Sequence, residues 1–279
     1  MLFRSVSQSR YHTPFADGVF KIRDENGVKE VVLEHETYES IYTAYDFKQD
    51  SIVLEFNFLE AVATLFHENP KKVLIIGVCG GALPLYLSKM YPDMDITGVD
   101  IDPTSEEIAR HEFGLPNNIE LVTADGYEYL KQSEESYDLI FVDINIVEDY
   151  PEQFLSEEWA YIVQTRLNPN GLAIIHQDYV FYQTKSFTEG VQDSSFGGDV
   201  QTAFIHKFQN YTGAFEYHGW LSYPEPFTLV GVYSNDRPLN RRELINKAIQ
   251  RSKGKSVSKK YFKRLVNFAG MFVNSISDI

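Results

Sequence analysis

The sequence predicts an α/β protein with a doubly wound, mostly parallel sheet, a small N-terminal β domain and a C-terminal helical tail. From Lys71 onward, short apolar strand patterns alternate with helical patterns, which is typical of a parallel sheet covered on both faces. A glycine-rich turn joins the first of these strands to its helix. Before residue 50, alternating apolar and polar residues indicate β structure.

Residues 1–50 form the predicted N-terminal β hairpin domain. The stretch GVFKIRDENGVKEVVLE has two alternating runs around Asn26-Gly27, which is a strong hairpin signal. TYESIYTAY continues as a third strand. A helix is expected next, over 51–68. Its apolar face holds Leu54, Phe58, Leu59, Val62, Leu65 and Phe66.

The central domain spans residues 51–238. Its strands are expected at 73–77, 95–100, 119–123, 138–143 and 171–176. Its helices are expected near 83–91, 104–112, 126–132 and 152–167. Two further apolar runs within 215–233 would close the sheet as an antiparallel pair.

The C-terminal tail, residues 239–279, differs from the rest of the chain in charge. It holds 10 of the 25 Lys and Arg residues but only 2 of the 40 Asp and Glu residues, so the remainder carries a net charge of −23. Two helices joined around 252–256 are expected, and the second, KKYFKRLVNFAGMFV, is basic and amphipathic. This helix would dock on its own acidic domain, or else lie on an anionic membrane or a partner.

Composition and motifs exclude several classes of protein. The acidic body repels phosphate backbones, so no nucleic-acid partner is expected. No apolar run approaches the roughly 18 residues of a membrane span, and the N-terminus lacks the apolar centre of a secretion signal. The single cysteine excludes an internal disulfide, so a cytoplasmic protein is predicted. Neither a metal-ligand spacing nor a Ser-His-Asp arrangement is visible.

The stretch KVLIIGVCGGALPL joins a buried strand to a helix through several small residues, among them Gly77, Gly80 and Gly81. Such a turn presents free backbone N–H groups, and glycine lets a ligand approach the backbone. In a parallel sheet this point faces the crevice beyond the carboxyl ends of the strands, where ligands bind. The match to GxGxxG is imperfect, however, and glycine here can also serve packing alone.

Three aspartates follow successive strands and converge on the same crevice. Asp100 ends the strand MDITGVDID, where a carboxylate can accept hydrogen bonds from ribose hydroxyls. Asp125 would accept from an adenine amino group or cap a helix. Asp102 is a further candidate helix cap, and Asp143 ends the fourth strand. Acids without an intact phosphate-binding loop favour a nucleoside with a cationic sulfonium arm over a nicotinamide dinucleotide.

The order IIGVCGGALPLYL, TGVDIDP, LVTADGYEYL and YDLIFVDIN resembles the class I S-adenosylmethionine-dependent transferases, and more narrowly the spermidine synthase superfamily. The resemblance covers roughly residues 1–233 and implies a Rossmann-like class I methyltransferase fold behind a small N-terminal β domain. It also implies S-adenosylmethionine, or its decarboxylated form, as the cofactor. The cofactor-binding residues that it implies are Gly77, Gly80, Gly81, Asp100, Ile101, Asp125, Gly126 and Asp143.

The chain departs from the polyamine synthases at two motifs. Their D-[ST]-S-D run, whose last Asp deprotonates the amine, reads Asp143-Ile144-Asn145-Ile146 here, and an aliphatic residue takes no proton. Their D-E-x-x-Y-x-E stretch is not evident in KQDSIVLEFNFLEAV, where Glu55 or Glu60 would substitute or simply be solvated. The run GGALPLYL is more similar to the loop of the superfamily's protein methyltransferases.

These observations favour an S-adenosylmethionine-dependent methyltransferase that acts on a small-molecule or protein amine. Asp143, Asn145 and His176 are the candidate catalytic residues, although a histidine at a strand end is often structural. The first alternative is a polyamine aminopropyltransferase in which Glu148 or Asp149 replaces the missing base. The second is a non-catalytic nucleoside-binding protein. Exposed β edges in the N-terminal domain also make a homodimer possible.

Overall fold

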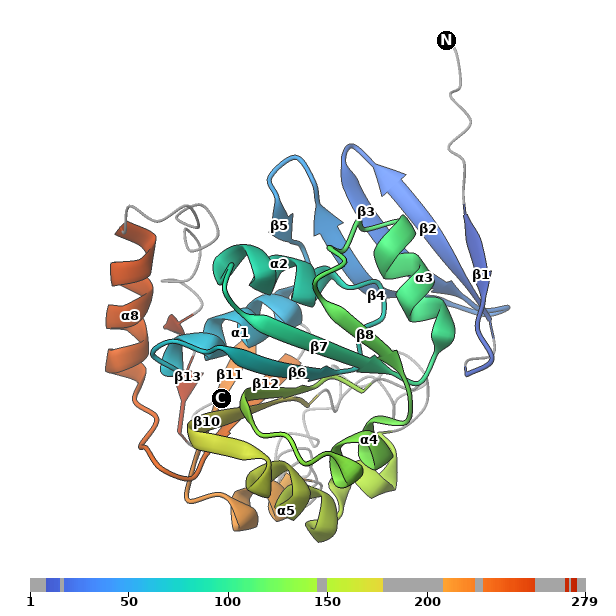
Figure 1. Ribbon diagram of the computed structural model, residues 1–279. Coiled ribbons are helices and arrows are strands. Elements are labelled where there is room, and N and C mark those ends of the chain that lie inside the picture. Colours follow the sequence, from blue (N-terminus) through green and yellow to red (C-terminus); the bar gives the residue numbers. More distant parts are fainter. Residues whose placement is uncertain are drawn as a thin grey trace, which may run out of the picture.

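The computed structural model describes residues 9–15, 18–144, 150–177, 208–223, 228–253, 269–270 and 272–274, and the side chains of these residues except at 55, 56, 222, 223 and 228. The strands and helices form two sheets, one of five strands near the N-terminus and one of eight strands that forms the centre of the molecule (Figure 1). Among the described residues, no helix combines the length and apolar character that a membrane span requires.

The N-terminal sheet has the strand order β1-β2-β3-β4-β5, with every neighbouring pair antiparallel. The predicted hairpin is confirmed, because Asn26 and Gly27 both adopt positive φ between β2 and β3, as a tight type I′ turn requires. The third predicted strand is β4. The five strands are β1 (Arg10–His12), β2 (Val19–Glu25), β3 (Val28–Glu34), β4 (Glu39–Asp46) and β5 (Ser51–Ile52).

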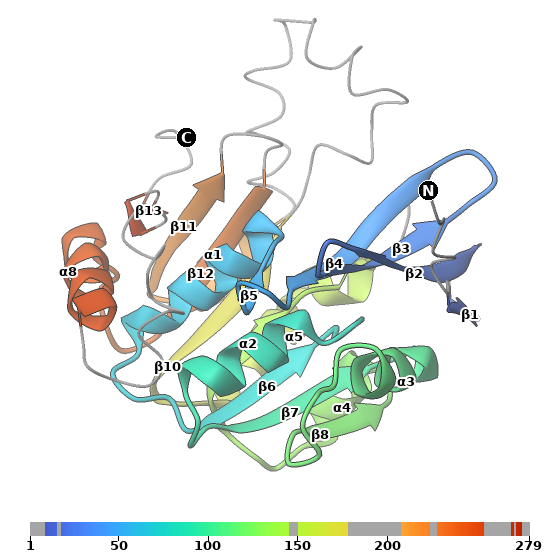
Figure 2. The ribbon, with the colours of Figure 1, turned by 90° about the horizontal axis from the view of Figure 1, so that it is seen from above.

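The expected helix over 51–68 is shorter and has two parts. Ser51–Ile52 pair with β4 as strand β5, so the helix α1 begins only at Glu55 (Glu55–Ala63). A 3-10 helix, η1 (Thr64–Phe66), follows it. Figures 1 and 2 place α1 over the same face of the main sheet as α2 (Ala82–Met90).

The main sheet has the order β13-β11-β12-β10-β9-β6-β7-β8. The five neighbouring strands β10-β9-β6-β7-β8 are parallel, whereas β12 is antiparallel to both β10 and β11. The predicted antiparallel closure is therefore confirmed. The strands are β6 (Lys72–Ile76), β7 (Asp95–Asp100), β8 (Glu120–Thr123), β9 (Tyr137–Val142), β10 (Leu167–His176), β11 (Tyr217–Tyr223), β12 (Thr228–Ser234) and β13 (Phe272–Val273).

Helices cover both faces of this sheet (Figure 1). On one face α1, α2 and α3 (Pro103–His111) share a core with the N-terminal sheet. On the other face lie α4 (Gly126–Gln132) and α5 (Glu157–Thr165), with η2 (Glu152–Leu155) and the helical residues 208–214. The helices α2, α3 and α4 lie within one residue of their predicted positions, because the apolar periodicity marks the buried stripe. The single helix expected over 152–167 is instead divided into η2 and α5, and α5 begins only at Glu157.

The N-terminal sheet is held to α3 by polar contacts as well as by the shared core. The Tyr11 hydroxyl donates to Oε1 of Glu112 over 3.0 Å, and Nζ of Lys29 donates to the carbonyl of Glu112 over 2.6 Å. These bonds fix the small sheet beside the carboxyl ends of β6 and β7 (Figure 2).

The first half of the tail forms the predicted helix, α8 (Arg241–Lys253). The expectation that a second helix runs through Val273 is wrong at its end, because Phe272 and Val273 form the edge strand β13. Phe272 is fully buried and its ring meets that of Phe66 at 4.8 Å. Burial of this aromatic ring against the main core decides the strand conformation. Residues 254–268 lie outside the described residues.

Candidate functional site

The strand order reverses around β6, which lies between β7 and β9. At such a switch point the connections leave in opposite directions, and a crevice opens beyond the carboxyl ends of the strands. Gly77 follows β6 and Asp143 follows β9, and the two backbones touch there: Asp143 N donates to the Ile76 carbonyl over 2.9 Å. Gly77 and Asp143, two of the predicted site residues, therefore lie at the switch point, where ligands bind in folds of this kind.

Each glycine of the turn has a packing reason of its own. A Cβ on Gly77 would lie 1.8 Å from the carbonyl oxygen of Asp143, and one on Gly80 would lie 2.4 Å from Cγ2 of Thr43 in the N-terminal sheet. Gly81 has φ +80° and is the N-cap of α2. Desolvation raises the pKa of the Cys79 thiol, so this side chain stays protonated. The turn is built for close approach between chain segments.

Asp100 organises this turn from the end of β7. Its Oδ2 accepts hydrogen bonds from the backbone N–H groups of Val78 and Cys79 over 2.8 and 2.9 Å, and its Oδ1 accepts from Asp102 N over 2.9 Å. Burial raises the pKa of Asp100, and these bonds offset that rise only in part. Oδ2 already accepts from two donors, so a ribose hydroxyl would have to donate to the second lone pair of Oδ1 while the side chain holds the turn.

Asp125 follows β8, which is hydrogen-bonded to β7. The helix-cap interpretation is confirmed, because Oδ1 of Asp125 accepts from the N–H groups of Tyr127 and Glu128 over 2.8 and 3.3 Å. Asp102 likewise caps α3 through Thr104 N. A cap through one oxygen leaves the other oxygen of Asp125 for a further donor.

Ile101 and Gly126 complete the expected nucleoside region. Ile101 is 40% exposed, which is unusual for an aliphatic side chain in this fold. A Cβ on Gly126 would lie 2.2 Å from Cγ2 of Ile76, so the start of α4 rests directly on the end of β6. A hollow of about 10 Å³, lined by residues of the turn, β7, α3 and β8, including Val78, Asp100 and Thr123, lies on this side and has room for about one water molecule.

Asp143 and His176 form a pair across the ends of β9 and β10. His176 Nδ1 lies 2.6 Å from Asp143 Oδ1, and the two side chains are 2% and 16% exposed. Because the carboxylate accepts, the pair places a proton on Nδ1. The structure thus brings together two of the three candidate catalytic residues. Asn145 lies outside the described residues, as do Ile146, Glu148 and Asp149.

Beneath this pair lies a buried polar cluster of aromatic side chains. The Gln177 side chain donates to the Tyr233 hydroxyl over 2.7 Å and accepts from Trp220 Nε1 over 3.2 Å. Burial, together with the charge of Asp143, raises the pKa of Tyr150. These hydroxyls stay neutral, so they add no charge near Asp143 and His176.

Glu60 on α1 was expected either to substitute for an acid of the D-E-x-x-Y-x-E stretch or to be solvated. Solvation is wrong, because Glu60 is fully buried and its Oε2 accepts from Nδ2 of the buried Asn57 over 3.0 Å. Its spacing from Glu55 equals that of the two glutamates in E-x-x-Y-x-E, with Phe58 at the tyrosine position. That spacing was the signal that would have identified it. Within the described residues, no group of His, Cys, Asp and Glu side chains has the arrangement of a metal site.

The sheet order, the antiparallel β12 and the acids at the carboxyl edge define a Rossmann-like fold of the class I methyltransferase type. The model of the spermine/spermidine synthase domain matches residues 55–205, more than half of the chain. The chain therefore belongs to the spermine/spermidine synthase family.

Curated relatives include both kinds of transferase. A probable polyamine aminopropyl transferase of Bifidobacterium longum is 33% identical over 51% of this chain and 33% of its own length. The polyamine aminopropyltransferase of Vibrio vulnificus is 28% identical over 52% of this chain and 54% of its own. A human eEF1A lysine and N-terminal methyltransferase is 28% identical over 40% of this chain and 18% of its own length. The chain thus spans only a third to about half of these two aminopropyltransferases, and less of the methyltransferase.

Solved structures share the fold over more of the chain. A probable spermidine synthase from Corynebacterium glutamicum superposes with a TM-score of 0.70 at 13% identity, covering 97% of this chain and 98% of its own. Human methyltransferase-like protein 13, solved with SAH, superposes with a TM-score of 0.54 at 18% identity, covering 77% of this chain and 93% of its own. At these identities the likeness establishes the fold alone.

Proposed function

We propose that the chain transfers an aminopropyl group from decarboxylated S-adenosylmethionine to an amine. The observation that carries the proposal is the uncompensated acidity of the crevice. Within the described residues, no Lys or Arg side chain pairs with any of the four aspartates at the carboxyl edge, Asp100, Asp102, Asp125 and Asp143. Such an edge attracts a cationic sulfonium and amine, and it repels the carboxylate of the ordinary cofactor.

The residues present fit this cofactor. Asp100 would accept from the ribose, and the second oxygen of Asp125 from the adenine amino group, while Gly77, Gly80, Gly81, Ile101 and Gly126 would shape the nucleoside pocket. When bound, the cofactor supplies an aminopropyl carbon activated by the positive sulfur. The amine nitrogen bonds to that carbon as the carbon–sulfur bond breaks, 5′-methylthioadenosine leaves, and one proton leaves the nitrogen.

Asp143 would meet the attacking amine, because it is the more exposed member of its pair. The Nδ1–H of His176 would hold the carboxylate with its second oxygen toward the crevice. This pair would take over the task of the aspartate that Ile146 replaces. Glu60, buried on α1, would bind the distal ammonium group of a diamine such as putrescine, which makes a diamine the favoured acceptor class.

A second candidate function, methyl transfer to an amine, rests on Ile146 and on the similarity to the human methyltransferase. Alignment of nucleophile and sulfonium can suffice for methyl transfer without a base. This function requires the carboxylated cofactor, so the two proposals differ in a measurable preference.

Calorimetry with the two cofactors, followed by product analysis with putrescine, tests the proposal. We expect at least tenfold tighter binding of the decarboxylated form, equal to about 1.4 kcal/mol, and formation of an aminopropylated amine. Tighter binding of the carboxylated form with no such product would favour methyl transfer. If neither binds, both candidates are wrong.

Glu60 provides the acceptor test. Glu60→Gln keeps the size and the contact with Asn57 but removes the charge, so we expect the KM for a diamine to rise about tenfold while cofactor affinity is unchanged. Glu107→Gln, on the solvent side of α3, is the matched control. An unchanged KM in Glu60→Gln would remove Glu60 from the acceptor site.

A further inference from the structure

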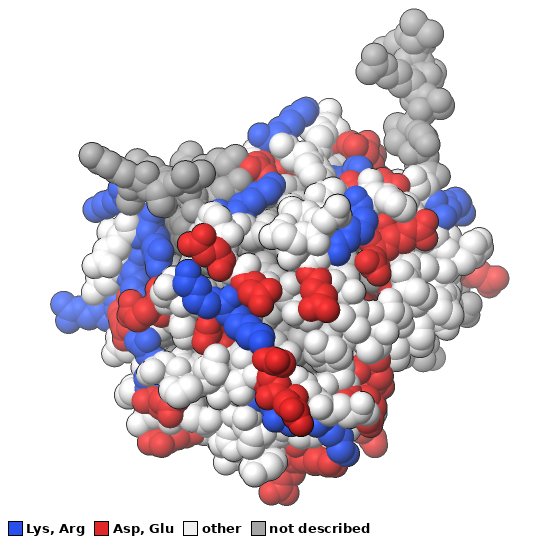
Figure 3. Space-filling model, in the orientation of Figure 1, with Lys and Arg blue, Asp and Glu red and all other residues white. Residues whose placement is uncertain are grey.

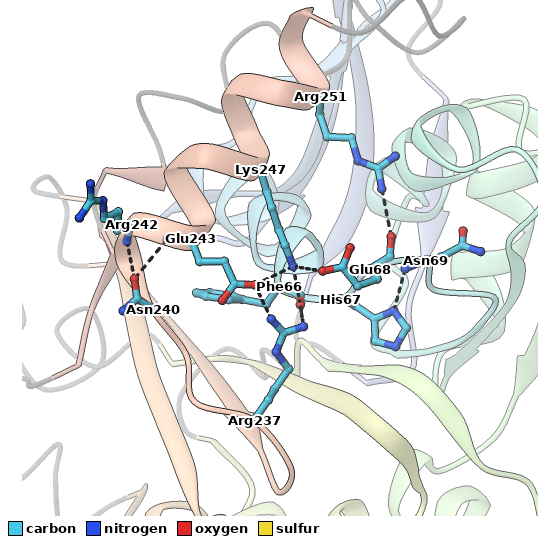
Figure 4. A network of polar contacts seen from close by, with 10 residues as sticks. All are labelled: Phe66, His67, Glu68, Asn69, Arg237, Asn240, Arg242, Glu243, Lys247 and Arg251. Atoms are coloured by element: carbon cyan, nitrogen blue, oxygen red, sulfur yellow. Dashed lines mark hydrogen bonds and ion pairs between the residues drawn. The ribbon is translucent and has the colours of Figure 1, made fainter.

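A second pocket, of about 760 Å³, lies between α8 and the segment that leads into β6. Figure 4 shows the side chains beside it, which come from residues 66–69, from Arg237 and Asn240, and from α8. Because this segment precedes β6, the pocket lies at the amino edge of the parallel strands, at the opposite end of β6 from Gly77. Its volume is that of a site for a small molecule.

Ion pairs fix the inner wall of this pocket. Lys247 Nζ lies 2.7 Å from Oε1 of Glu68 and 2.9 Å from Oε1 of Glu243, and Arg237 pairs with the same Glu243 and donates to the Phe66 carbonyl over 2.6 Å. The pKa values of Glu68 and Glu243 are both lowered, Glu68 first by its hydrogen bond from Lys247 and Glu243 by ion pairs that outweigh its burial. Both acids are therefore charged and already held by cations.

The pocket keeps an excess of positive charge beyond these pairs. Arg242 and Arg251 also line it, so three cations and two anions line the pocket in the described part of the chain. A fourth cation, Arg237, pairs with Glu243 but is not part of the lining. Arg251 donates to the carbonyl of Glu68 over 3.1 Å. Figure 3 shows Lys and Arg side chains gathered over α8 at the left edge of the molecule.

Neutral donors complete the lining. Asn246 and Gln250 lie on the same helix as these cations. His67 Nδ1 accepts from Asn69 N over 3.3 Å, and burial lowers the pKa of His67, so its imidazole is neutral and carries its proton on Nε2. Guanidinium groups with amide and imidazole N–H donors suit the several oxygens of a phosphate group better than a single carboxylate.

We propose that this pocket binds a phosphate-bearing anion, either a nucleotide or an inorganic polyphosphate. The site is separate from the adenosyl crevice, since the two lie at opposite edges of the main sheet. The inference does not rest on the proposed transferase function. An anionic ligand would account for the basic side chains of α8 in a protein that is otherwise acidic.

Calorimetry with tripolyphosphate as the probe tests the site, because this anion has no nucleoside that would enter the adenosyl crevice. Gln250→Glu adds one negative charge to the lining at an exposed position, and we expect it to weaken binding about tenfold. Arg241→Gln on the same helix changes the net charge equally but lies outside the lining. We expect less than a twofold effect from this control.

Calorimetry with adenosine triphosphate, in the presence of saturating 5′-methylthioadenosine, distinguishes a nucleotide ligand from an inorganic polyphosphate. Tighter binding than that of tripolyphosphate, with the same loss in Gln250→Glu, assigns the site to nucleotides, and equal affinity assigns it to the phosphate groups alone. No saturable binding of either probe up to about 1 mM would overturn the proposal. So would an equal loss in both variants, which indicates diffuse attraction by the tail.

Discussion

The Nδ1 atom of His176 lies 2.6 Å from the Oδ1 atom of Asp143, although 33 residues separate them in the chain. Parallel pairing of β9 with β10 brings the ends of the two strands together. The imidazole is almost completely buried, and the carboxylate is the member that meets solvent. This relationship gives the proposed site a carboxylate of fixed orientation.

Replacing His176 tests whether the pair supports catalysis. His176→Phe removes the donor to Asp143, and we expect kcat for amine transfer to fall about 100-fold, with the cofactor affinity within threefold of the original. His176→Gln keeps an N–H donor and should restore about a tenth of the activity. A His176→Phe enzyme with unchanged kcat would contradict the role. Thermal melting of both variants separates lost folding from lost function.

Replacing Asp100 tests the nucleoside site. Asp100→Asn puts an N–H group where backbone N–H groups and a ribose hydroxyl donate, so we expect the affinity for 5′-methylthioadenosine to fall about 100-fold. Asp95→Asn, at the exposed opposite end of β7, changes the charge equally and should leave the affinity unchanged. Equal affinities in the two variants would place the nucleoside elsewhere.

The affinity for 5′-methylthioadenosine should also depend on pH. Burial raises the pKa of Asp100, and a protonated carboxyl loses acceptor capacity. We therefore expect affinity to decline as the pH falls below neutrality through the raised pKa. Titration calorimetry at several pH values should show this decline in the original protein and a flat profile in Asp100→Asn.

Replacing Gly77 tests the close approach of the ends of β6 and β9. Gly77→Ala combines φ +90° with a Cβ 1.8 Å from a backbone oxygen, so we expect a loss of more than about 3 kcal/mol of unfolding free energy. Gly114→Ala has φ +66° but open space, and should lose about 1–2 kcal/mol, the cost of the left-handed conformation. Urea denaturation measures both. Equal losses would show that the contact with Asp143 tolerates a methyl group.

Replacing Asp138 tests a group of hydrogen bonds at the amino edge of the sheet. Its carboxylate accepts from Lys71 N, Lys72 N and Asn168 Nδ2 over 2.7, 3.0 and 2.9 Å. Asp138→Ala should lower the unfolding free energy by about 2 kcal/mol. Asp93→Ala breaks only an exposed ion pair 3.7 Å long and should cost less than about 0.5 kcal/mol.

Lowering the pH should remove the contribution of Asp138 to the unfolding free energy. Burial raises its pKa, but the hydrogen bonds from Asn168 and the two N–H groups outweigh this, so its pKa is lowered in the folded chain. Its stabilisation is therefore complete above the unfolded value of about 3.9 and is lost as the pH falls through the folded value. The difference in unfolding free energy between the original protein and Asp138→Ala should narrow below about pH 4. A constant difference would contradict this account.

The alternation of strands and helices, the hairpin at Asn26-Gly27 and the acids at the strand ends follow from local patterns in the chain. Apolar periodicity and turn residues act over a few positions, so the chain need not be folded for them to be recognised. The caps formed by Asp102 and Asp125 are local in the same way, since each side chain bonds to N–H groups two or three residues ahead.

Local patterns do not say which of these residues come into contact in the folded chain. The contact of Gly80 with Thr43, the burial of Glu60 and the pairing of Asp143 with His176 depend on how distant segments are ordered in space. A strand pattern indicates that a strand exists but not which strand lies beside it. At Phe272–Val273 the local pattern indicated a helix, and pairing with β11 makes these residues a strand instead. Pairing and packing between remote segments are settled by the free energy of the whole fold, and no short stretch of sequence contains that quantity.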